Sequence, residues 1–229
     1  MVLKSEYPRN LVPEFFDNTA RSYDRIVNVT TFGKDKCWKR EILKQIPQCD
    51  KILDLACGTG ILTYQIAKQF PDSQVTGIDV TESYLNEAKK KLMPHHKISF
   101  ALQDAEKLNL AQKFDCIVSS YVPKYCNPDR LIQSCMSHLE PDGKIILHDF
   151  VYPKNNMVII LWHAYFAVLG AAGLFMPQWK KVFADLPELI RLTRWLDDCD
   201  KAMTKHHLHT ERKMLTWNCS AILTGIKKI

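Results

Sequence analysis

The chain has 229 residues, with 31 lysines and arginines against 25 aspartates and glutamates, so its net charge is +6. Apolar residues make up 46% and charged residues 24%, a globular composition that excludes collagen-like, low-complexity and disordered chains. A chain of this length fits one domain, whose core is large enough to fold without disulfides or a structural metal. The positive charge is small and dispersed, whereas nucleic-acid-binding proteins carry a clustered basic surface, so we expect no nucleic-acid partner.

Eight cysteines are scattered along the chain without a CxxC pair. Disulfide frameworks are typical of short secreted chains, and the amino terminus lacks the continuous apolar stretch of a secretory signal. We therefore expect free thiols and a cytoplasmic protein. His206, His207 and His209 lack the spacing and the carboxylate of a known zinc motif, so no metal site is predicted.

The predicted elements change in character near residue 50. Before it, two helical apolar stripes run from Phe15 to Val27 and from Trp38 to Ile46. After it, short apolar runs alternate with helical patterns. Strands are predicted at residues 51–55, 74–79, 98–102, 114–119 and 144–149, and helices at residues 61–70, 82–92 and 128–139. This alternation indicates right-handed crossovers and a parallel sheet covered by helices on both faces.

The last third of the chain is predicted to be helix-rich before it returns to the sheet. Leu186, Pro187 and Glu188 are expected to open a helix that runs through Asp200. Residues 209–217 and 219–228 then form two strand-like runs with Asn218 between them, typical of an antiparallel hairpin at a sheet edge. The predicted fold class is α/β: a Rossmann-like, doubly wound, seven-stranded, mostly parallel sheet with an antiparallel C-terminal hairpin and an N-terminal helical cap.

A glycine-rich turn follows the first predicted strand, at the sheet edge where open α/β sheets bind ligands. It reads Asp54-Leu-Ala-Cys-Gly58-Thr-Gly60-Ile-Leu-Thr63. A dinucleotide-binding turn would have a third glycine where this chain has Thr63, which disfavours an NAD-dependent oxidoreductase. The carboxylate of Asp54 would repel a pyrophosphate but attract an ammonium group.

Two further acidic residues follow the next two strands. Asp79 ends the second strand, nineteen residues past Gly60, and can accept hydrogen bonds from the hydroxyls of a ribose. Asp104, followed by Ala105, stands after the third strand, where an adenine amino group could be recognised. Together with Asp54, these positions describe a ligand with an ammonium group, a ribose and an adenine, but no phosphate. The sequence therefore predicts S-adenosylmethionine as the cofactor.

With these motifs in this order, the chain resembles the class I S-adenosylmethionine-dependent methyltransferases over almost its whole length. Within them it is most similar to the ubiquinone/menaquinone biosynthesis C-methyltransferases, whose pattern is F-D-x-I-A-x-x-Y-D-x-x-N followed by S-F-G-x-D-x-x-W-R-R. The matching stretches here are Phe16-Asp-Asn-Thr-Ala-Arg-Ser-Tyr23-Asp24 with Asn28, then Phe32-Gly33 and Trp38-Lys-Arg40. The resemblance implies cofactor contacts at Thr63, Asp79, Asp104, Ala105 and Ser120, with Tyr23 and the Gly58–Gly60 backbone lining the same pocket.

The acceptor side departs from the family pattern. A G-L-R-N-like stretch is replaced by Tyr121-Val-Pro-Lys124, and a glutamate-phenylalanine pair by His148-Asp149-Phe150. The resemblance implies C-methylation of a prenylated quinol, in which we expect His148 or Asp149 to take or relay a ring-hydroxyl proton. Lys124 would stabilise the phenolate, and Tyr121 would line the ring pocket. O- or N-methylation of another small lipophilic acceptor and a non-catalytic S-adenosylmethionine-binding subunit are the alternatives.

Residues 157–176 form an apolar segment of twenty residues without a formal charge, long enough to cross a hydrocarbon core of about 30 Å. A membrane-spanning helix would separate the final hairpin from its partner strands, so the topology excludes it. A buried core helix, a lid over the acceptor pocket, a homodimer surface and a peripheral contact with lipid headgroups are left open.

These expectations describe a single methyltransferase domain over residues 1–229. Its parts are a helical cap at residues 1–50, the cofactor-binding βα units at 51–150, a helical insertion or lid at 151–208, and the terminal hairpin at 209–229.

Overall fold

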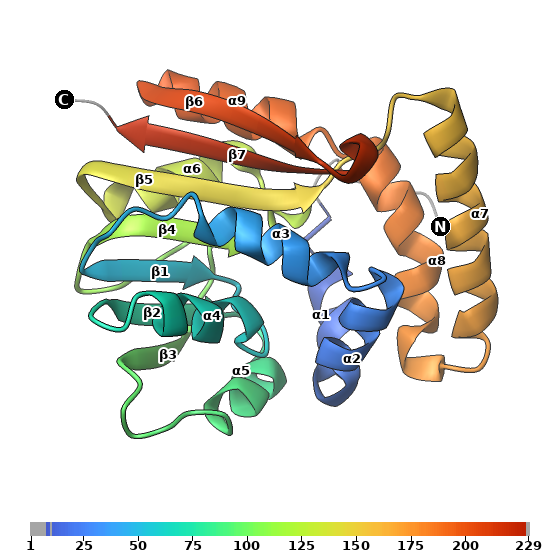
Figure 1. Ribbon diagram of the computed structural model, residues 1–229, viewed down its shortest axis with the longest axis horizontal. Helices are drawn as coiled ribbons and strands as arrows, with labels where there is room; N and C mark the ends of the chain where they lie inside the picture. The colour runs from blue at the N-terminus through green and yellow to red at the C-terminus, as the bar shows by residue number, and fades with distance from the viewer. Residues whose placement is uncertain (1–7, 10, 228–229) are drawn as a thin grey trace.

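The computed structural model describes residues 8–9 and 11–227 of the chain, so residues 1–7 and 10 of the expected cap and residues 228–229 of the expected terminal hairpin lie outside it. A seven-stranded sheet in the order β3-β2-β1-β4-β5-β7-β6 forms its centre (Figure 1). β1 to β5 are parallel, whereas β7 is antiparallel to both β5 and β6. The predicted fold class is confirmed. The strands are β1 Lys51–Leu55, β2 Gln74–Asp79, β3 Ile98–Leu102, β4 Phe114–Ser120, β5 Leu139–Phe150, β6 Leu208–Leu215 and β7 Ser220–Lys227.

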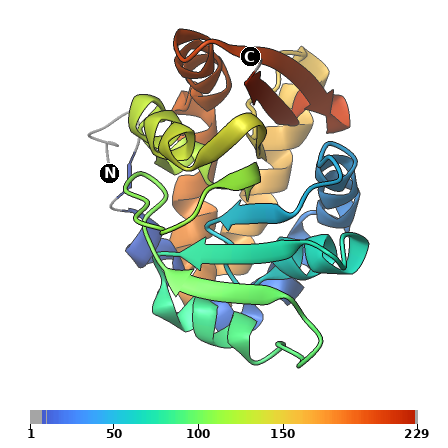
Figure 2. The same ribbon diagram turned by 90° about the vertical axis from the view of Figure 1, so that its left-hand side faces the viewer.

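Helices cover both faces of this sheet, and a further group of helices stands beyond the carboxyl ends of its strands (Figures 1 and 2). The central strands are apolar runs because neither face meets water, as is usual for parallel sheets. The helices are α1 Leu11–Phe16, α2 Ala20–Thr30, α3 Lys34–Leu43, α4 Ile61–Gln69, α5 Glu82–Lys89, α6 Pro128–Ser137, α7 Asn156–Gly173, α8 Pro177–Leu192 and α9 Trp195–Lys205.

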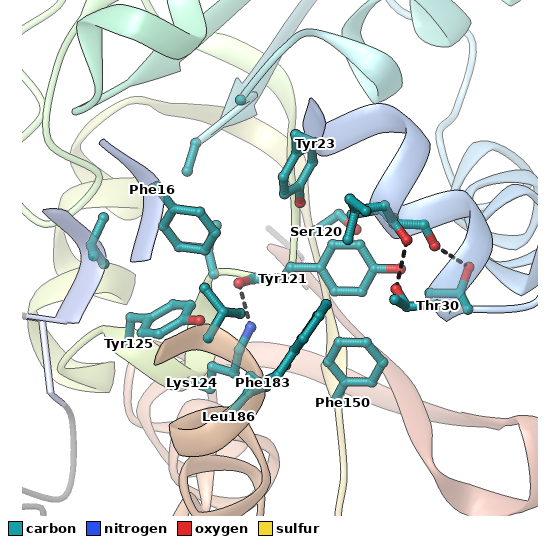
Figure 3. A pocket seen from close by; sticks show the side chains of 18 of the residues that line it. Phe16, Tyr23, Thr30, Ser120, Tyr121, Lys124, Tyr125, Phe150, Phe183 and Leu186 are labelled. Atoms are coloured by element: carbon teal, nitrogen blue, oxygen red, sulfur yellow. Dashed lines mark hydrogen bonds between the residues drawn. The ribbon is translucent and has the colours of Figure 1, made fainter. Parts of the chain in front are cut away.

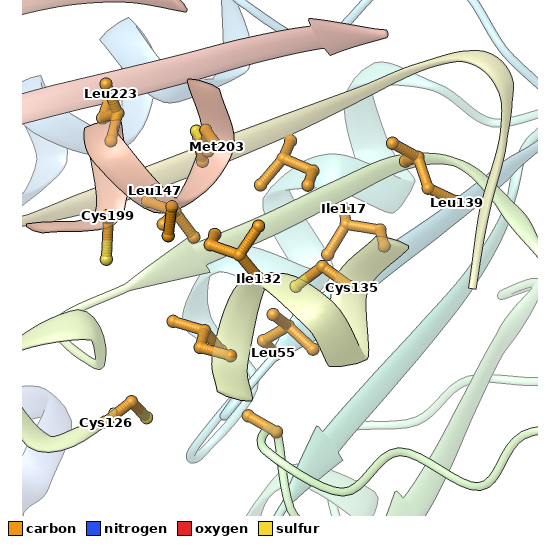
Figure 4. Packing of buried hydrophobic residues seen from close by; sticks show 14 of the residues in the cluster. Leu55, Ile117, Cys126, Ile132, Cys135, Leu139, Leu147, Cys199, Met203 and Leu223 are labelled. Atoms are coloured by element: carbon orange, nitrogen blue, oxygen red, sulfur yellow. The ribbon is translucent and has the colours of Figure 1, made fainter. Parts of the chain in front are cut away.

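Two hydrophobic cores lie on opposite faces of the sheet. α6 and α9 cover one face, where Ile132 and Cys135 pack with Cys199 and Met203 (Figure 4). α3 and α4 cover the other face with Ile42, Leu43, Leu62 and Ile66. All eight cysteines are free, and five of them are buried.

The helices α1, α2, α7 and α8 stand beyond the carboxyl ends of β1, β4 and β5 (Figure 1). α1 and α8 share a smaller apolar cluster that includes Leu11, Phe15, Trp179 and Phe183. α7 packs beside α8, and the Tyr165 hydroxyl donates a 2.6 Å hydrogen bond to the carbonyl of Thr30 in α2. This group of helices forms a wall opposite the strand ends.

The prediction of one helix from residue 186 to residue 200 is wrong. Pro187 lies inside α8, which begins ten residues earlier at Pro177, where a proline is tolerated because the first helical N–H needs no partner. The chain then breaks at Thr193, which is extended, and α9 begins at Trp195. The proline was therefore a poor indicator of the helix start.

Other boundaries also differ from the prediction. The expected helix at residues 128–139 ends at Ser137, and β5 begins at Leu139 instead of Lys144, with an irregular register against β4 between Phe114 and Cys116. The helix predicted at residues 82–92 ends at Lys89. The turn of the last hairpin is η2, Thr216–Asn218, a 3-10 turn with positive φ at all three residues instead of a single-residue turn.

The apolar segment forms α7, the helix among the described residues that is long and apolar enough to cross a membrane by length and composition, with a mean hydropathy of 1.5. Only 17% of it is buried, and Trp162 and Gly173 are its buried residues. The alternative of a buried core helix is therefore wrong.

Trp195 joins the α9 core to the end of β5, because its indole N–H donates a 2.6 Å hydrogen bond to the carbonyl of Phe150. Trp195→Phe retains a buried ring but leaves this carbonyl without its donor, so we expect a loss of about 1–3 kcal/mol in the free energy of unfolding, measured by urea denaturation. Trp217→Phe, at an exposed position, is the matched control and should change it by less than about 0.5 kcal/mol. Equal effects of the two substitutions would contradict this assignment.

Candidate functional site

A cavity of about 1040 Å³ lies at the carboxyl edge of the sheet (Figure 3). The glycine turn after β1 and the ends of β2 and β4 form one side of it, and α1, α2, α7 and α8 contribute the other. Ligand pockets have volumes of roughly 300–1,000 Å³. The cavity therefore has room for a cofactor together with a second ligand.

The turn after β1 requires glycine at two positions. Gly58 and Gly60 have φ of +57° and +80°, which side chains rarely adopt, and a Cβ at Gly60 would lie 2.9 Å from the Tyr64 ring. Ala56 and Gly58 line the cavity, whereas Gly60 does not. The turn thus presents bare backbone to any ligand in the cavity.

Asp79, at the end of β2, lies at the cavity wall with its carboxylate almost fully buried. The backbone N–H groups of Gly58 and Thr81 each donate a 2.8 Å hydrogen bond to it, one to each oxygen. Burial raises the pKa of Asp79, and these two hydrogen bonds oppose the shift. The carboxylate is fixed against the turn, and its remaining lone pairs are available to a ligand.

Asp54 and Thr63 lie behind the turn instead of lining the cavity. The Thr63 hydroxyl donates a 2.6 Å hydrogen bond to the Asp54 carboxylate, and both side chains are buried. Burial raises the pKa of Asp54 to about 7, although the Thr63 hydrogen bond opposes the shift. The expected ammonium-binding carboxylate is therefore held one layer below the cavity surface.

Asp104 and Ala105 line the cavity beyond β3. Asp104 forms an ion pair with Arg9, and the Glu106 N–H donates a 3.0 Å hydrogen bond to its other oxygen. This carboxylate is therefore already engaged, which sequence reasoning did not anticipate because Arg9 lies 95 residues away.

Tyr23 belongs to an aromatic cluster that sequence analysis did not detect as a unit. Its ring lies 5.2 Å from that of Tyr84 and stacks at 6.3 Å on that of Trp179, in α8. Phe16 contacts Tyr23, Tyr84 and Tyr125 edge-on. These five side chains, which we call the aromatic cluster, all line the cavity. Their positions in four separate parts of the chain left no local sequence signal.

Lys124 and Asp149 form a buried ion pair beside the cavity, with 2.9 Å between Lys124 Nζ and Asp149 Oδ1. Lys124 Nζ also donates a 2.6 Å hydrogen bond to the Tyr121 carbonyl and lies 4.4 Å from the centre of the Tyr125 ring (Figure 3). Burial lowers the pKa of Lys124 and raises that of Asp149, and their mutual attraction opposes both shifts. Lys124 lines the cavity, whereas Asp149 lies behind it.

Tyr121 is held by a second buried ion pair, which sequence analysis missed. Its hydroxyl donates a 2.8 Å hydrogen bond to Asp35, and Asp35 is paired with Lys39 one helical turn on. Lys39 Nζ lies 5.0 Å from the centre of the Tyr121 ring, which stacks on Phe150. Asp35 and Lys39 fall within the amino-terminal stretch that resembles the family, so the resemblance could have drawn attention to them. Their contact with Tyr121, however, can be recognised only in the folded chain.

His148 lies behind Ser120 and Tyr121 and outside the cavity lining. Its Nδ1 is 3.0 Å from the Ser120 hydroxyl and its Nε2 is 2.7 Å from the Ser220 hydroxyl. Burial lowers the pKa of His148 well below its ordinary value, and the charges of Lys39 and Lys124 lower it further. With both ring nitrogens engaged, direct proton transfer between His148 and an acceptor in the cavity does not fit this geometry.

The structure thus separates the expected site residues into two groups. The residues that line the cavity are Tyr23, Gly58, Asp79, Asp104, Ala105, Ser120, Tyr121 and Lys124. The residues that lie behind them are Asp54, Gly60, Thr63, His148 and Asp149.

Comparison with known proteins identifies similar sequences. Residues 52–143 match the family model described as a methyltransferase domain. The chain is 26% identical over its whole length to the demethylmenaquinone methyltransferase of Lactobacillus johnsonii, covering 97% of that protein. It is 30% identical over 79% of its length to the ubiquinone/menaquinone biosynthesis C-methyltransferase UbiE of Pseudomonas entomophila, covering 74% of that protein.

Solved structures share the fold at lower identity. One is a complex between the Haloferax volcanii Trm112 methyltransferase activator and a methyltransferase, with a TM-score of 0.66 at 15% identity over 93% of this chain and 98% of that one. Another is the plantazolicin methyltransferase BpumL in complex with a monoazolic desmethylPZN analogue and S-adenosylhomocysteine, with a TM-score of 0.60 at 17% identity over 96% of this chain and 90% of that one.

The buried carboxyl of Asp54 should make stability depend on pH. Its folded-state pKa of about 7 exceeds the unfolded value of roughly 3.9, so the folded state binds the proton more tightly and loses stability as the pH rises between these values. Asp54→Asn keeps an acceptor for Thr63 and removes the titration. Between pH 5 and pH 8, the wild type should lose about 2–3 kcal/mol relative to this variant.

Urea denaturation at intervals between pH 5 and pH 8 measures this difference. Asp129→Asn, at an exposed carboxylate, is the control and should run parallel to the wild type. A gap between the wild type and D54N that is the same at pH 5 and pH 8 would contradict the raised pKa.

Proposed function

The chain belongs to the class I S-adenosylmethionine-dependent methyltransferases, in the family of the ubiquinone/menaquinone biosynthesis C-methyltransferases, and we propose that its acceptor is a prenylated quinol methylated on a ring carbon. The methyl donor is S-adenosylmethionine. The observation that carries the proposal is the cavity, which combines a large apolar wall with Lys124, whose buried partner Asp149 lies behind the lining.

The apolar wall supports an acceptor with a hydrocarbon tail. α1, α7 and α8 contribute side chains without charge to the cavity, and they stand across from the strand ends where the cofactor turn lies. These side chains are Val12, Phe16, Val158, Leu161, Leu169, Val182, Phe183 and Leu186. The relatives named for demethylmenaquinone methylation and for ubiquinone/menaquinone biosynthesis favour a quinol as the head of such a molecule. A tail of this kind also favours peripheral contact with a membrane.

The residues at the turn fit the cofactor. In our proposal Asp79 accepts hydrogen bonds from the ribose, and the bare backbone at Gly58 allows close approach. Ala105 and Asp104 border the adenine, with Asp104 held by Arg9. The remaining contacts proposed from the family are Tyr23 and Ser120 at the cavity wall, with Asp54, Gly60 and Thr63 supporting the turn from behind.

The division of the chain follows from the same proposal. Residues 51–150 hold most of the cofactor site and supply Tyr121 and Lys124 to the acceptor. The described part of the helical cap at 1–50 adds Tyr23 to the cofactor site and, with the insertion at 151–208, supplies the apolar side of the cavity. Residues 209–227, the described part of the expected segment 209–229, belong to the hairpin that closes the sheet.

S-adenosylmethionine supplies an electrophilic methyl group when bound, so this chain has to make the acceptor carbon nucleophilic and align it. Positioning of this kind contributes about 7–11 kcal/mol in well-oriented cases. A quinol carbon becomes nucleophilic when the ring hydroxyl loses its proton. The Lys124 ammonium, held 2.9 Å from Asp149 in a low-dielectric site, is the group that stabilises the phenolate in this proposal. Tyr121, fixed by Asp35, lines the ring pocket.

The proton of the ring hydroxyl leaves by the same pair. Lys124 Nζ gives a proton to Asp149 Oδ1 and receives the hydroxyl proton, so the phenolate faces an ammonium and Asp149 becomes neutral. After methylation the ring carbon loses its own hydrogen as a proton to solvent, and the proton held by Asp149 returns through Lys124 to the ring oxygen. The lowered pKa of Lys124 and the raised pKa of Asp149, both caused by burial, favour this direction. His148 takes no proton in this scheme. It holds the Ser120 hydroxyl through Nδ1 and contacts the Tyr121 ring.

A methyl-transfer assay tests the acceptor. With labelled S-adenosylmethionine, we expect transfer to a ring carbon of a prenylated quinol, located by mass spectrometry, and a kcat/KM at least tenfold above that of the same quinol without its tail. Transfer to oxygen or nitrogen, or equal use of the tail-less quinol, would contradict the proposal. Tight cofactor binding without transfer to quinols, phenols or amines would make the chain a binding subunit instead.

A second assay tests the charge pair. Lys124→Met combined with Asp149→Asn removes both charges, which avoids leaving one buried charge unpaired. We expect kcat to fall about 100-fold or more, as when a donor to a developing oxyanion is removed, while the affinity for S-adenosylhomocysteine in calorimetry stays within threefold. Lys181→Met, which removes a half-exposed lysine paired with Glu14, is the control and should keep its kcat. An unchanged kcat in the double variant would exclude the pair from catalysis.

A further inference from the structure

α7 and the two residues after it expose an apolar face that no other residue in the described part of the chain covers. Phe175 is 88% exposed and Met157 75% exposed, values typical of charged surface side chains. The residues of this surface, which we call the apolar face, are Met157, Ile160, Leu161, Ala164, Ala167, Val168, Ala171, Leu174 and Phe175. With helical spacing they share one side of the helix, and the opposite side packs on the body of the protein through Trp162 and Tyr165.

We propose that the apolar face docks onto the surface of an anionic lipid bilayer, with α7 lying flat in the headgroup region. α7 has 18 residues and a length of about 27 Å. Both of its ends return to the folded body, at β5 and at α8, so it cannot cross the bilayer without pulling the sheet apart. A helix that is apolar on the outside and anchored on the inside buries only its outer half, as interfacial helices do.

The charges around the face fit a bilayer better than a protein partner. No lysine, arginine, aspartate or glutamate lies between Lys154 and Lys180, and both of these lysines are exposed. Basic residues at the two ends can reach phosphate groups while the apolar stretch enters the lipid. Protein interfaces, by contrast, are only about 56–65% apolar and use polar groups for roughly ten hydrogen bonds. The apolar face has His163 and Asn156 as polar neighbours at its margin.

Two exposed aromatic residues from other parts of the chain extend the face. Phe32, 81% exposed, contacts the Tyr165 ring of α7, and Trp217, 73% exposed, stands at the tip of the last hairpin. Aromatic side chains are favoured where an apolar surface meets water, as at the membrane interface. Trp217 has φ of +53°, and this strained turn conformation is used to present a large apolar ring to solvent.

The apolar face is continuous with the cavity. Leu161 and Val168 are exposed on the face and also line the cavity, and Phe32, Lys34 and Trp217 line it as well. A bilayer on this face would therefore lie against the part of the cavity wall that α7, the loop before α3 and the last hairpin form. The role that we give to this continuity rests on the proposed function: a lipophilic acceptor would enter the cavity directly from the lipid. Docking itself requires no acceptor.

Flotation with vesicles tests the docking. The full chain, without acceptor or cofactor, is mixed with vesicles of phosphatidylcholine containing about 30% phosphatidylglycerol, or of phosphatidylcholine alone. We expect it to float with the anionic vesicles and at least fivefold less with the neutral ones. Ile160→Ser combined with Phe175→Ser, at two positions outside the cavity lining, should reduce the partition coefficient at least tenfold. Met93→Ser combined with Leu102→Ser, at exposed apolar positions near β3, is the matched control and should float like the wild type.

Binding of S-adenosylhomocysteine by both double variants shows that they are folded. Flotation of I160S/F175S equal to that of the wild type, or no flotation of the wild type, would overturn the proposal. Sedimentation velocity of the vesicle-free protein tests whether the apolar face binds a second copy of the chain instead. If the wild type is a dimer that only I160S/F175S dissociates, and it does not float, the proposal is also overturned. Flotation is measured without any acceptor. A negative flotation result therefore does not affect the quinol methylation assay, and a negative quinol assay does not affect the docking proposal.

Discussion

The parallel strands β1, β2, β4 and β5 bring polar side chains to one buried edge of the sheet, and a buried polar group is costly unless it is hydrogen-bonded. Each of these strand ends has found a partner on another element. Asp79 accepts from the turn after β1, and Asp149 is paired with Lys124 of the segment after β4. The need for partners therefore ties the loops to the strand ends and shapes the cavity they surround.

Local sequence patterns predicted those elements whose cause is local. Apolar runs located β1, β2 and β3 at their observed bounds. β1 and β2 leave a continuous signal because they are buried on both faces, whereas the edge strand β3 has only half-buried and exposed residues. The glycine turn could also be recognised from the sequence, because the positive φ at Gly58 and Gly60 favours glycine at these two positions. Pro187 misled the prediction because prolines are most common at helix starts. α8 continues through this proline because the helix is stabilised by its packing, with Leu189 and Ile190 buried.

The acceptor side could be predicted only in part, because its geometry depends on contacts between distant residues. Lys124 was identified as a charged residue after one strand and Asp149 as the last residue of another, but their pairing needed β4 and β5 to be neighbours. Asp35, 86 residues from Tyr121, has no local signal that would connect it to that ring. His148 was the natural candidate for a base by residue type. Its neighbours Ser120 and Ser220, the latter on β7, engage both ring nitrogens, which only the sheet order reveals.

α7 combines the two kinds of constraint in a single helix. The inner side of α7 has to be apolar because it closes the cavity. Its outermost residues, such as Met157 and Ile160, do not line the cavity, and charged residues would be favoured at such positions because they face solvent. A lid that only covered a site would therefore be amphipathic, as α8 is, with Lys180, Lys181 and Glu188 along its length. The outer side of α7 instead keeps Met157 and Ile160 in contact with solvent, as does Phe175 two residues beyond the helix. An apolar environment that meets the outer side explains both halves of the helix, and a lipid surface supplies it without requiring a complementary protein.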